Sequence, residues 1–364
     1  MKKKWISFIL LLALMLSGCN GVYNGSYSTV MPHVKPQVPV VEQALSAQNY
    51  KQLSETLEKL IESGKSEAVI SVEEYNQEQL QTDMQTICSL IKVNHSVSAY
   101  ALDNLSYEFG IKDGQSVLSV TIAYTKNITD ILSIRSATDM DKAAEQIRNA
   151  VARCDATLIL KVADYEELDL IQVVDAHALN NPQMVMEVPQ VSWKTYPNSG
   201  ESRVLEVFFT YQTSRDSMKS MQERVGRVFE SASLYISGDA SETEKYMQLF
   251  SFLMERYDYQ YDTSITPVYS LLSHGVGDSR AFAMVYGAMC RQANLECIVV
   301  SGAKDGESRY WNIIRRDGTY YHVDLLEGNY QERTDEEMTG YVWDYSAYPI
   351  CTDTPIPREP MRAE

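Results

Sequence analysis

Three short blocks of this sequence recur once each, in the same order, at an offset of 86–90 residues. Their apolar and β-branched residues are typical of strands. In both halves a turn signal follows the second block, Lys112-Asp113-Gly114 in the first half and Pro197-Asn198-Ser199-Gly200 in the second. A repeat of this kind indicates one structural unit used twice. The matching blocks are residues 68–75 with 158–165, 105–107 with 191–193, and 120–124 with 207–211.

We therefore predict two repeated α+β modules, residues 66–153 and 154–238. Each is expected to contain a strand, a connection, a hairpin and a closing helix, with the closing helices near residues 138–152 and 214–232. Neither module shows a catalytic constellation, so a spacer or binding role fits them.

Residues 41–65, in front of the modules, carry leucines at helical spacing from Leu45 onwards and end at Gly64. This pattern predicts one amphipathic helix. His95 and His177 are lone histidines in polar surroundings, and we predict that both lie at the surface.

The N-terminus reads as a processing signal. Three lysines precede an apolar run that ends at Leu16, which is too short for a membrane span and typical of a secretory signal. Leu16-Ser17-Gly18-Cys19 then has the pattern of a bacterial lipobox. We predict a signal peptide over residues 1–18, lipidation of Cys19 by diacylglycerol and palmitate chains, and a tether over 19–40. The protein would then be anchored to the cell membrane on its extracytoplasmic face; an ordinary signal peptide with an incidental cysteine is the alternative.

Charge and cysteine spacing exclude several classes of function. The net charge is −17, which disfavours a nucleic-acid partner because phosphate binding needs clustered Lys and Arg. The five cysteines after Cys19 have no CxxC spacing, so neither a zinc site nor a disulfide framework is indicated, and we expect no metal or other cofactor. Cys290 and Cys297 are expected to be buried thiols.

The third region, residues 239–364, is organised around one helix. The region begins with a predicted helix over residues 241–256, but the organising helix starts later, near Ser279. Gly277 precedes Asp278 and Ser279, two good helix N-caps, of which we predict Ser279 to serve as the cap. A helix N-terminus acidifies a thiol and stabilises an anion, so it suits a nucleophile, and here it holds a serine. Apolar residues at helical spacing then predict the buried stripe of this helix. Asn294 is expected to adopt the left-handed conformation that ends it. The stripe comprises Phe282, Val285, Tyr286 and Met289.

A hairpin follows this helix. If Asp317-Gly318 is a two-residue turn, strands 309–315 and 319–325 pair with Ile313 opposite His322 and with Trp311 opposite Asp324. Arg309 then lies diagonally from Asp324 on the same face as Trp311 and His322.

Three segments of this region resemble the transglutaminase-like superfamily of papain-type cysteine enzymes. They are Gly277-Asp278-Ser279-Arg280-Ala281-Phe282-Ala283, Arg309-Tyr310-Trp311-Asn312 and Tyr320-Tyr321-His322-Val323-Asp324. The resemblance covers about residues 241–350 and implies a papain-like α+β domain. The expected fold class is thus α+β, with two repeated modules followed by a transglutaminase-like domain.

The same resemblance implies which positions carried catalysis. Ser279 stands where the family has its nucleophilic cysteine, Arg309 where it has the general-base histidine, and Asp324 keeps the family's aspartate. A serine needs a base, and an arginine stays protonated and cannot accept its proton. His322, beside Asp324, and His274, in the loop before the helix, are the alternative bases. We therefore predict a catalytically degenerate site.

The predicted function is binding or scaffolding at the cell surface, with a peptide, a cell-wall stem peptide or another surface protein as partner. Two alternatives stay open at this point. The chain could be a serine-based hydrolase or acyltransferase that acts on such peptides through Ser279. Otherwise the repeated modules could carry the function.

Overall fold

The computed structural model describes residues 45–261 and 264–352. The predicted signal peptide, Cys19 and the tether lie outside this part of the chain. Within it, no helix combines the length and the apolar character needed to cross a bilayer. The fold is α+β, as predicted.

The first sheet has three antiparallel strands in the order β1-β3-β2. The helix predicted over residues 41–65 begins later than expected, at Tyr50, because Asn49 caps it. Ser46, before the cap, forms a β-bridge to Ser71. The predicted end of the helix at Gly64, which has a φ of 65°, is confirmed. The elements are α2 (Tyr50–Glu62), β1 (Glu67–Ser71), α3 (Gln77–Asn94), α4 (Ser96–Ala101), β2 (Leu102–Lys112) and β3 (Gln115–Tyr124).

The second sheet has the order β4-β5-β7-β6, so its last three strands repeat the order of the first sheet. Tyr107 faces Val120 in the first sheet, and Trp193 faces Val207 in the second. The elements are α5 (Ile128–Leu132), β4 (Arg135–Ala137), α6 (Met140–Ala152), β5 (Thr157–Val162), α7 (Leu170–Asn180), β6 (Gln190–Tyr196) and β7 (Arg203–Thr210).

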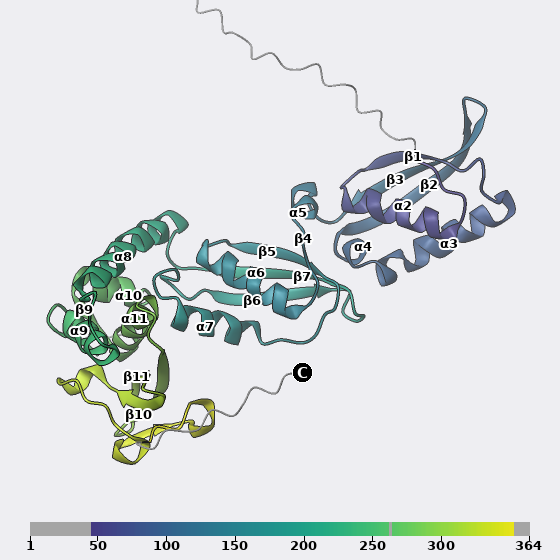
Figure 1. Ribbon diagram of the computed structural model, residues 1–364. Coiled ribbons are helices and arrows are strands. Elements are labelled where there is room, and N and C mark those ends of the chain that lie inside the picture. Colours follow the sequence, from purple (N-terminus) through teal and green to yellow (C-terminus); the bar gives the residue numbers. More distant parts are fainter. Residues whose placement is uncertain (1–44, 262–263, 353–364) are drawn as a thin grey trace, which may run out of the picture. The chain divides into compact units, whose positions relative to one another are not determined.

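The two helices predicted to close the modules pack elsewhere. The buried face of α6 contacts β5 and α7 in the core of the second sheet (Figure 1). The buried residues of α8 (Arg215–Tyr235) join the core of the C-terminal domain. The packing therefore groups α6 with β4 and β5, and α8 with the C-terminal domain. The module boundaries at 153/154 and 238 stay predictions. That the two sheets are copies of one unit stays a prediction, which their common strand order supports.

His95 is buried, contrary to prediction. It caps α4 by accepting a bond from the Ser98 N–H, and its Nε2 lies 3.1 Å from Glu62 Oε1. The local partner Ser98 and the non-local partner Glu62 replace water around the ring. His177 is partly buried on α7.

The C-terminal domain packs α11 against a four-stranded antiparallel sheet of order β12-β11-β10-β13. The predicted stripe of α11 is buried, Asn294 has a φ of 60°, and Cys290 and Cys297 are buried thiols, as predicted. The elements are α9 (Glu242–Met254), β8 (Asp258–Tyr259), α10 (Pro267–Tyr269), η1 (Ser270–His274), β9 (Val276–Gly277), α11 (Ser279–Gln292), β10 (Cys297–Lys304), β11 (Glu307–Arg316), β12 (Thr319–Val323), η2 (Leu325–Glu327), η3 (Asp335–Glu337), β13 (Tyr341–Trp343) and η4 (Tyr345–Ala347).

The hairpin of β11 and β12 has the predicted register, with Ile313 opposite His322. The strand β12 ends at Val323 rather than at 325, because Asp324 caps η2, so the predicted strand pairing of Trp311 with Asp324 is not formed. Asp317 and Gly318 have φ values of 50° and 86°, the conformation of a two-residue type I′ turn. Gly302 allows a close approach elsewhere in the sheet, because a Cβ there would lie 2.3 Å from the Val342 carbonyl oxygen. The sheet thus fixes the positions of β11, β12 and β13 around Trp311.

Candidate functional site

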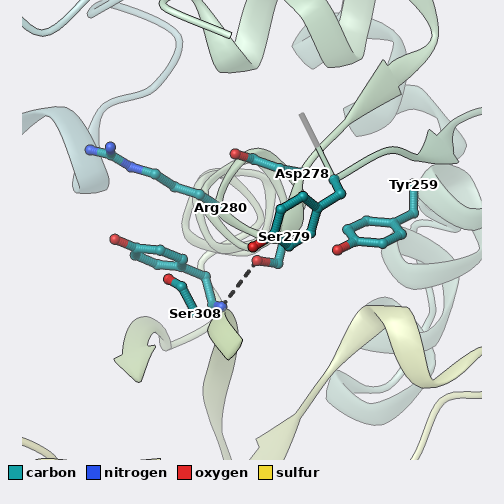
Figure 2. A pocket seen from close by; sticks show the side chains of 7 residues that line it. Tyr259, Asp278, Ser279, Arg280 and Ser308 are labelled. Atoms are coloured by element: carbon teal, nitrogen blue, oxygen red, sulfur yellow. Dashed lines mark hydrogen bonds between the residues drawn. The ribbon is translucent and has the colours of Figure 1, made fainter. Parts of the chain in front are cut away.

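Ser279 is the first residue of α11 and is almost buried. The N-cap is its neighbour Asp278, whose Oδ1 accepts a bond from the Ala281 N–H at 2.8 Å. The prediction that Ser279 caps the helix is therefore wrong; the carboxylate outcompetes the hydroxyl by charge as well as position. The Ser279 Oγ instead accepts a bond from the Tyr310 N–H at 3.2 Å (Figure 2).

Arg309 and Asp324 form the bidentate pair that the hairpin register predicts. The Arg309 Nε lies 2.8 Å from Asp324 Oδ2, and its Nη2 lies 3.0 Å from Oδ1. The exposed fractions of the two side chains are 14% and 2%. Burial lowers the pKa of Arg309, but the bonds to Asp324 and the charge of that carboxylate together outweigh burial, so the pKa lies above its usual value. A guanidinium held in this way cannot act as a base.

Two further donors complete the bonding of Asp324. The Leu326 N–H donates to Oδ1 at 3.0 Å, and the Tyr341 hydroxyl lies 2.7 Å from Oδ2. Burial, and then the Asp324 charge, raise the pKa of Tyr341, so the hydroxyl keeps its proton. We call Arg309, Asp324 and Tyr341 the cleft cluster. Its carboxylate has four donors and no free position for an imidazole.

Neither candidate base reaches Ser279. The His322 Nδ1 accepts from the Trp311 Nε1–H at 2.9 Å, and its Nε2 lies 2.8 Å from Asp335 Oδ1. Both ring nitrogens are therefore occupied. His274 is exposed and packs edge-on against Tyr269. Within residues 45–261 and 264–352, no histidine, lysine or carboxylate bonds to the Ser279 hydroxyl.

One potential metal-ligating atom from each of His322, Asp335 and Cys351 lies within 4.8 Å of the other two, a spacing that a bound metal ion would allow. The indole N–H of Trp311 can only donate, so the single proton of a neutral His322 ring lies on Nε2, towards Asp335. A metal at Nε2 would require both ring nitrogens to lack protons. Burial also raises the pKa of the Cys351 thiol to about 12. These donors do not fit a metal ion. We call the group formed by Trp311, His322, Asp335 and Cys351 the histidine cluster.

A cavity of about 420 Å³ opens in front of Ser279. The parallel pairing of β8 with β9 brings Tyr259 beside it, and Figure 2 shows Ser279 between Tyr259 and Arg280. Ser308 and Tyr310, on either side of Arg309 in the sequence, line the cavity from β11. The complete lining is Tyr259, Tyr261, Asp278, Ser279, Arg280, Ser308 and Tyr310.

Residues 230–325 match the sequence model of the family described as the transglutaminase-like superfamily. The C-terminal domain is transglutaminase-like. The match includes Ser279, Arg309 and Asp324, the positions that the resemblance assigns to a triad, and ends just after Asp324, whereas β13 and Tyr341 lie beyond it.

Solved structures similar to the chain include one titled as a TGase, at 12% identity and a TM-score of 0.28, with 56% of this chain and 62% of that chain covered. LapG of Legionella pneumophila is similar at 14% identity and a TM-score of 0.26, with 36% of this chain and 74% of that chain covered. The chain thus spans less than two thirds of the length of the first structure. A search of curated protein sequences finds no match.

Sequence reasoning missed several residues of the transglutaminase-like site. Tyr341 reaches Asp324 only because β13 pairs with β10, far along the chain. Tyr259 and Tyr261 lie in a tyrosine-rich turn. The cluster of tyrosines is visible in the sequence, but no pattern there predicts that it lines this site. Arg280 directly follows Ser279, and its exposure in the cavity depends on the helix start at Ser279.

Proposed function

We propose that the transglutaminase-like domain has no acyl-transfer or hydrolase activity and binds an extended peptide in the cleft beside Ser279. The observation that carries this proposal is the bidentate bonding of Asp324 by Arg309. It fills the place where a base would have to stand and leaves Ser279 with a backbone N–H as its partner. A hydroxyl that receives a bond but has no acceptor able to take its proton is a poor nucleophile.

The fold supports peptide as the ligand class, because papain-like domains hold an extended peptide beside the nucleophile; this step is an analogy of fold. A cell-wall stem peptide or a segment of another surface protein would meet the description. We further propose that Cys19 is lipidated and anchors the protein at the extracytoplasmic face of the cell membrane. The lipobox motif carries that part.

The activity part is tested with a fluorophosphonate probe and with hydrolysis of p-nitrophenyl acetate. We expect no covalent label on Ser279 and no rate above that of the Ser279→Ala variant. The double variant Ser279→Cys with Arg309→His is the matched positive control, because it places a thiol and an imidazole at these two positions of the site. Ser279-dependent labelling of the natural protein would establish a serine enzyme and end the proposal.

The anchoring part is tested by a Cys19→Ala change and by globomycin treatment of the producing cells. Both should leave the precursor uncleaved. Unchanged processing in both cases would show that the lipobox assignment is wrong.

A further inference from the structure

Arg280 differs from every other arginine of the transglutaminase-like domain. Over residues 239–261 and 264–352, each of the other six bonds to a carboxylate or to backbone carbonyls, whereas Arg280 has no ion pair. Its Nε is buried without a hydrogen-bond partner, as are those of Arg315 and Arg316, and its guanidinium lies 5.8 Å from the ring centre of Tyr310. The difference is that Arg315 and Arg316 each reach a carboxylate with another nitrogen, whereas Arg280 reaches none in the described part of the chain. The partnered arginines are Arg256, Arg291, Arg309, Arg315, Arg316 and Arg333.

We propose that Arg280 anchors the carboxylate of a peptide bound in the cavity beside Ser279. This inference rests on the proposed function and specifies its ligand. A buried N–H without an acceptor costs free energy until an acceptor arrives. In a chain with 49 acidic and 32 basic residues, an arginine left without a carboxylate inside a cavity is therefore an unusual arrangement. A ligand carboxylate would give it the planar partner that a guanidinium bonds best.

The remaining lining defines what is attached to that carboxylate. Five hydroxyl groups line the cavity, and each can donate and accept, which suits the alternating N–H and C=O groups of a peptide. The hydroxyls belong to Tyr259, Tyr261, Ser279, Ser308 and Tyr310.

The charge balance of the cavity argues against a polyanion. Arg280 is its single cation, and the Asp278 carboxylate also lines it while bonding to the Ala281 N–H. A phosphate polymer would meet one guanidinium, one carboxylate and a protein of net charge −17. A neutral sugar could use the hydroxyls and rings but would leave Arg280 without an acceptor. The arrangement favours a short peptide with one free carboxylate.

The test uses the folded full chain and an array of N-acetylated tetrapeptides, each made as the free acid and as the C-terminal amide. Binding is measured by fluorescence anisotropy. We expect free acids of the best binders to bind about tenfold more tightly than their amides, as the loss of a charged hydrogen bond implies. Arg280→Gln should remove this preference, and Arg280→Lys should keep part of it.

Arg316→Gln is the matched control, because Arg316 lies at the opposite end of β11 from Ser308 and pairs with Glu332. It should bind like the natural protein, and circular dichroism checks that all variants are folded. Equal binding of acids and amides, or unchanged binding by Arg280→Gln, would refute the anchor while leaving peptide binding intact. Arg280-dependent binding of polyphosphate without peptide binding would refute the ligand class. Cleavage of a peptide in a Ser279-dependent way would instead refute the proposed function.

Discussion

Trp311 contacts two acidic centres whose chemistry differs. Its ring packs edge-on against Tyr341 of the cleft cluster at 5.2 Å between ring centres, and its Nε1–H donates to His322 of the histidine cluster. The cleft cluster pairs its carboxylate with a guanidinium, which cannot take a proton. The histidine cluster pairs its carboxylate with an imidazole, which can. The domain therefore contains a His–Asp pair, but both nitrogens of that ring are occupied and neither bonds to Ser279.

This difference shows that a residue type does not make a site. His322 stands two residues before Asp324, yet it bonds to Asp335 instead, a residue of η3. Each centre is a satisfied polar network, and a satisfied network makes the fold more rigid. The comparison predicts different responses of the two centres to mutation and to pH.

The largest effect is expected from breaking the cleft cluster. Arg309→Ala leaves the nearly buried Asp324 carboxylate without its cation and should lower the free energy of unfolding by about 3–5 kcal/mol. Asp324→Asn combined with Arg309→Ala should recover part of this loss, because the uncompensated charge is gone. Urea unfolding of the two single variants and the double variant gives the coupling energy. Additive effects would show that the pair is not a stabilising unit.

The second effect concerns the histidine cluster. His322→Phe leaves the buried Trp311 N–H without an acceptor and should cost about 1–3 kcal/mol of unfolding free energy. Burial lowers the pKa of His322 and the bond to Asp335 only partly opposes this, so the unfolded chain takes up the proton first as pH falls. The contribution of His322 is thus fully present above a pH of about 6.5, the pKa of an unperturbed histidine, and declines as pH falls towards the folded pKa.

The measurement is the unfolding free energy of the natural protein and of His322→Phe between pH 5 and 8. Burial also lowers the pKa values of His95 and His177, so both proteins should lose stability in acid, and the natural protein should lose more. His274→Gln, which changes an exposed ring, is the control and should follow the natural protein. Identical slopes for the natural protein and His322→Phe would contradict the assignment.

The sequence predicted the cleft cluster better than the histidine cluster for a physical reason. Arg309 and Asp324 lie on one hairpin, where the Asp317-Gly318 turn fixes the register and a two-residue period fixes the face. Asp335 reaches His322 through a loop, and Cys351 and Tyr341 join Trp311 through a loop and through the pairing of β13 with β10. No local pattern encodes those contacts. The contact between Arg309 and Asp324 was thus predictable, and the contacts of Asp335, Cys351 and Tyr341 were not.

The sequence blocks that predict a repeat fall on strands of two sheets with a common strand order, but these blocks do not fix where each predicted module begins. Residues 49–64 and 139–154 show corresponding features at an offset of 90 residues: the N-caps Asn49 and Asp139, and left-handed ends at Gly64 and Cys154. Helix periodicity shows which face is buried but not whether the sheet that covers it comes before or after. Packing assigns α6 to the second sheet, of which only β4 precedes the helix, and the sequence alone could not have done so.

A third effect compares thiol reactivity in the histidine cluster with that in the cavity at Ser279. Cys351, in the histidine cluster, is buried and has a pKa raised to about 12, so iodoacetamide at pH 8 should leave it unmodified in the folded protein. The thiol introduced by Ser279→Cys lines an open cavity at a helix N-terminus and should react about tenfold faster or more. Peptide mapping by mass spectrometry gives both rates in one sample. Faster alkylation of Cys351 would reverse the contrast.

The smallest effect is expected at Ser279 itself. Asp278 rather than Ser279 caps α11, so Ser279→Ala removes only the acceptor of the Tyr310 N–H and should cost about 0.5–1.5 kcal/mol. Asp278→Ala removes the cap and the carboxylate at the positive end of the helix. It should lower the free energy of unfolding by about 0.5–2 kcal/mol, more than Ser279→Ala does. Urea midpoints of the two variants measure the order. If Ser279→Ala is the more damaging change, the hydroxyl has a partner beyond the Tyr310 N–H. Ser279 would then have a role in the cleft that its bond to Tyr310 does not explain.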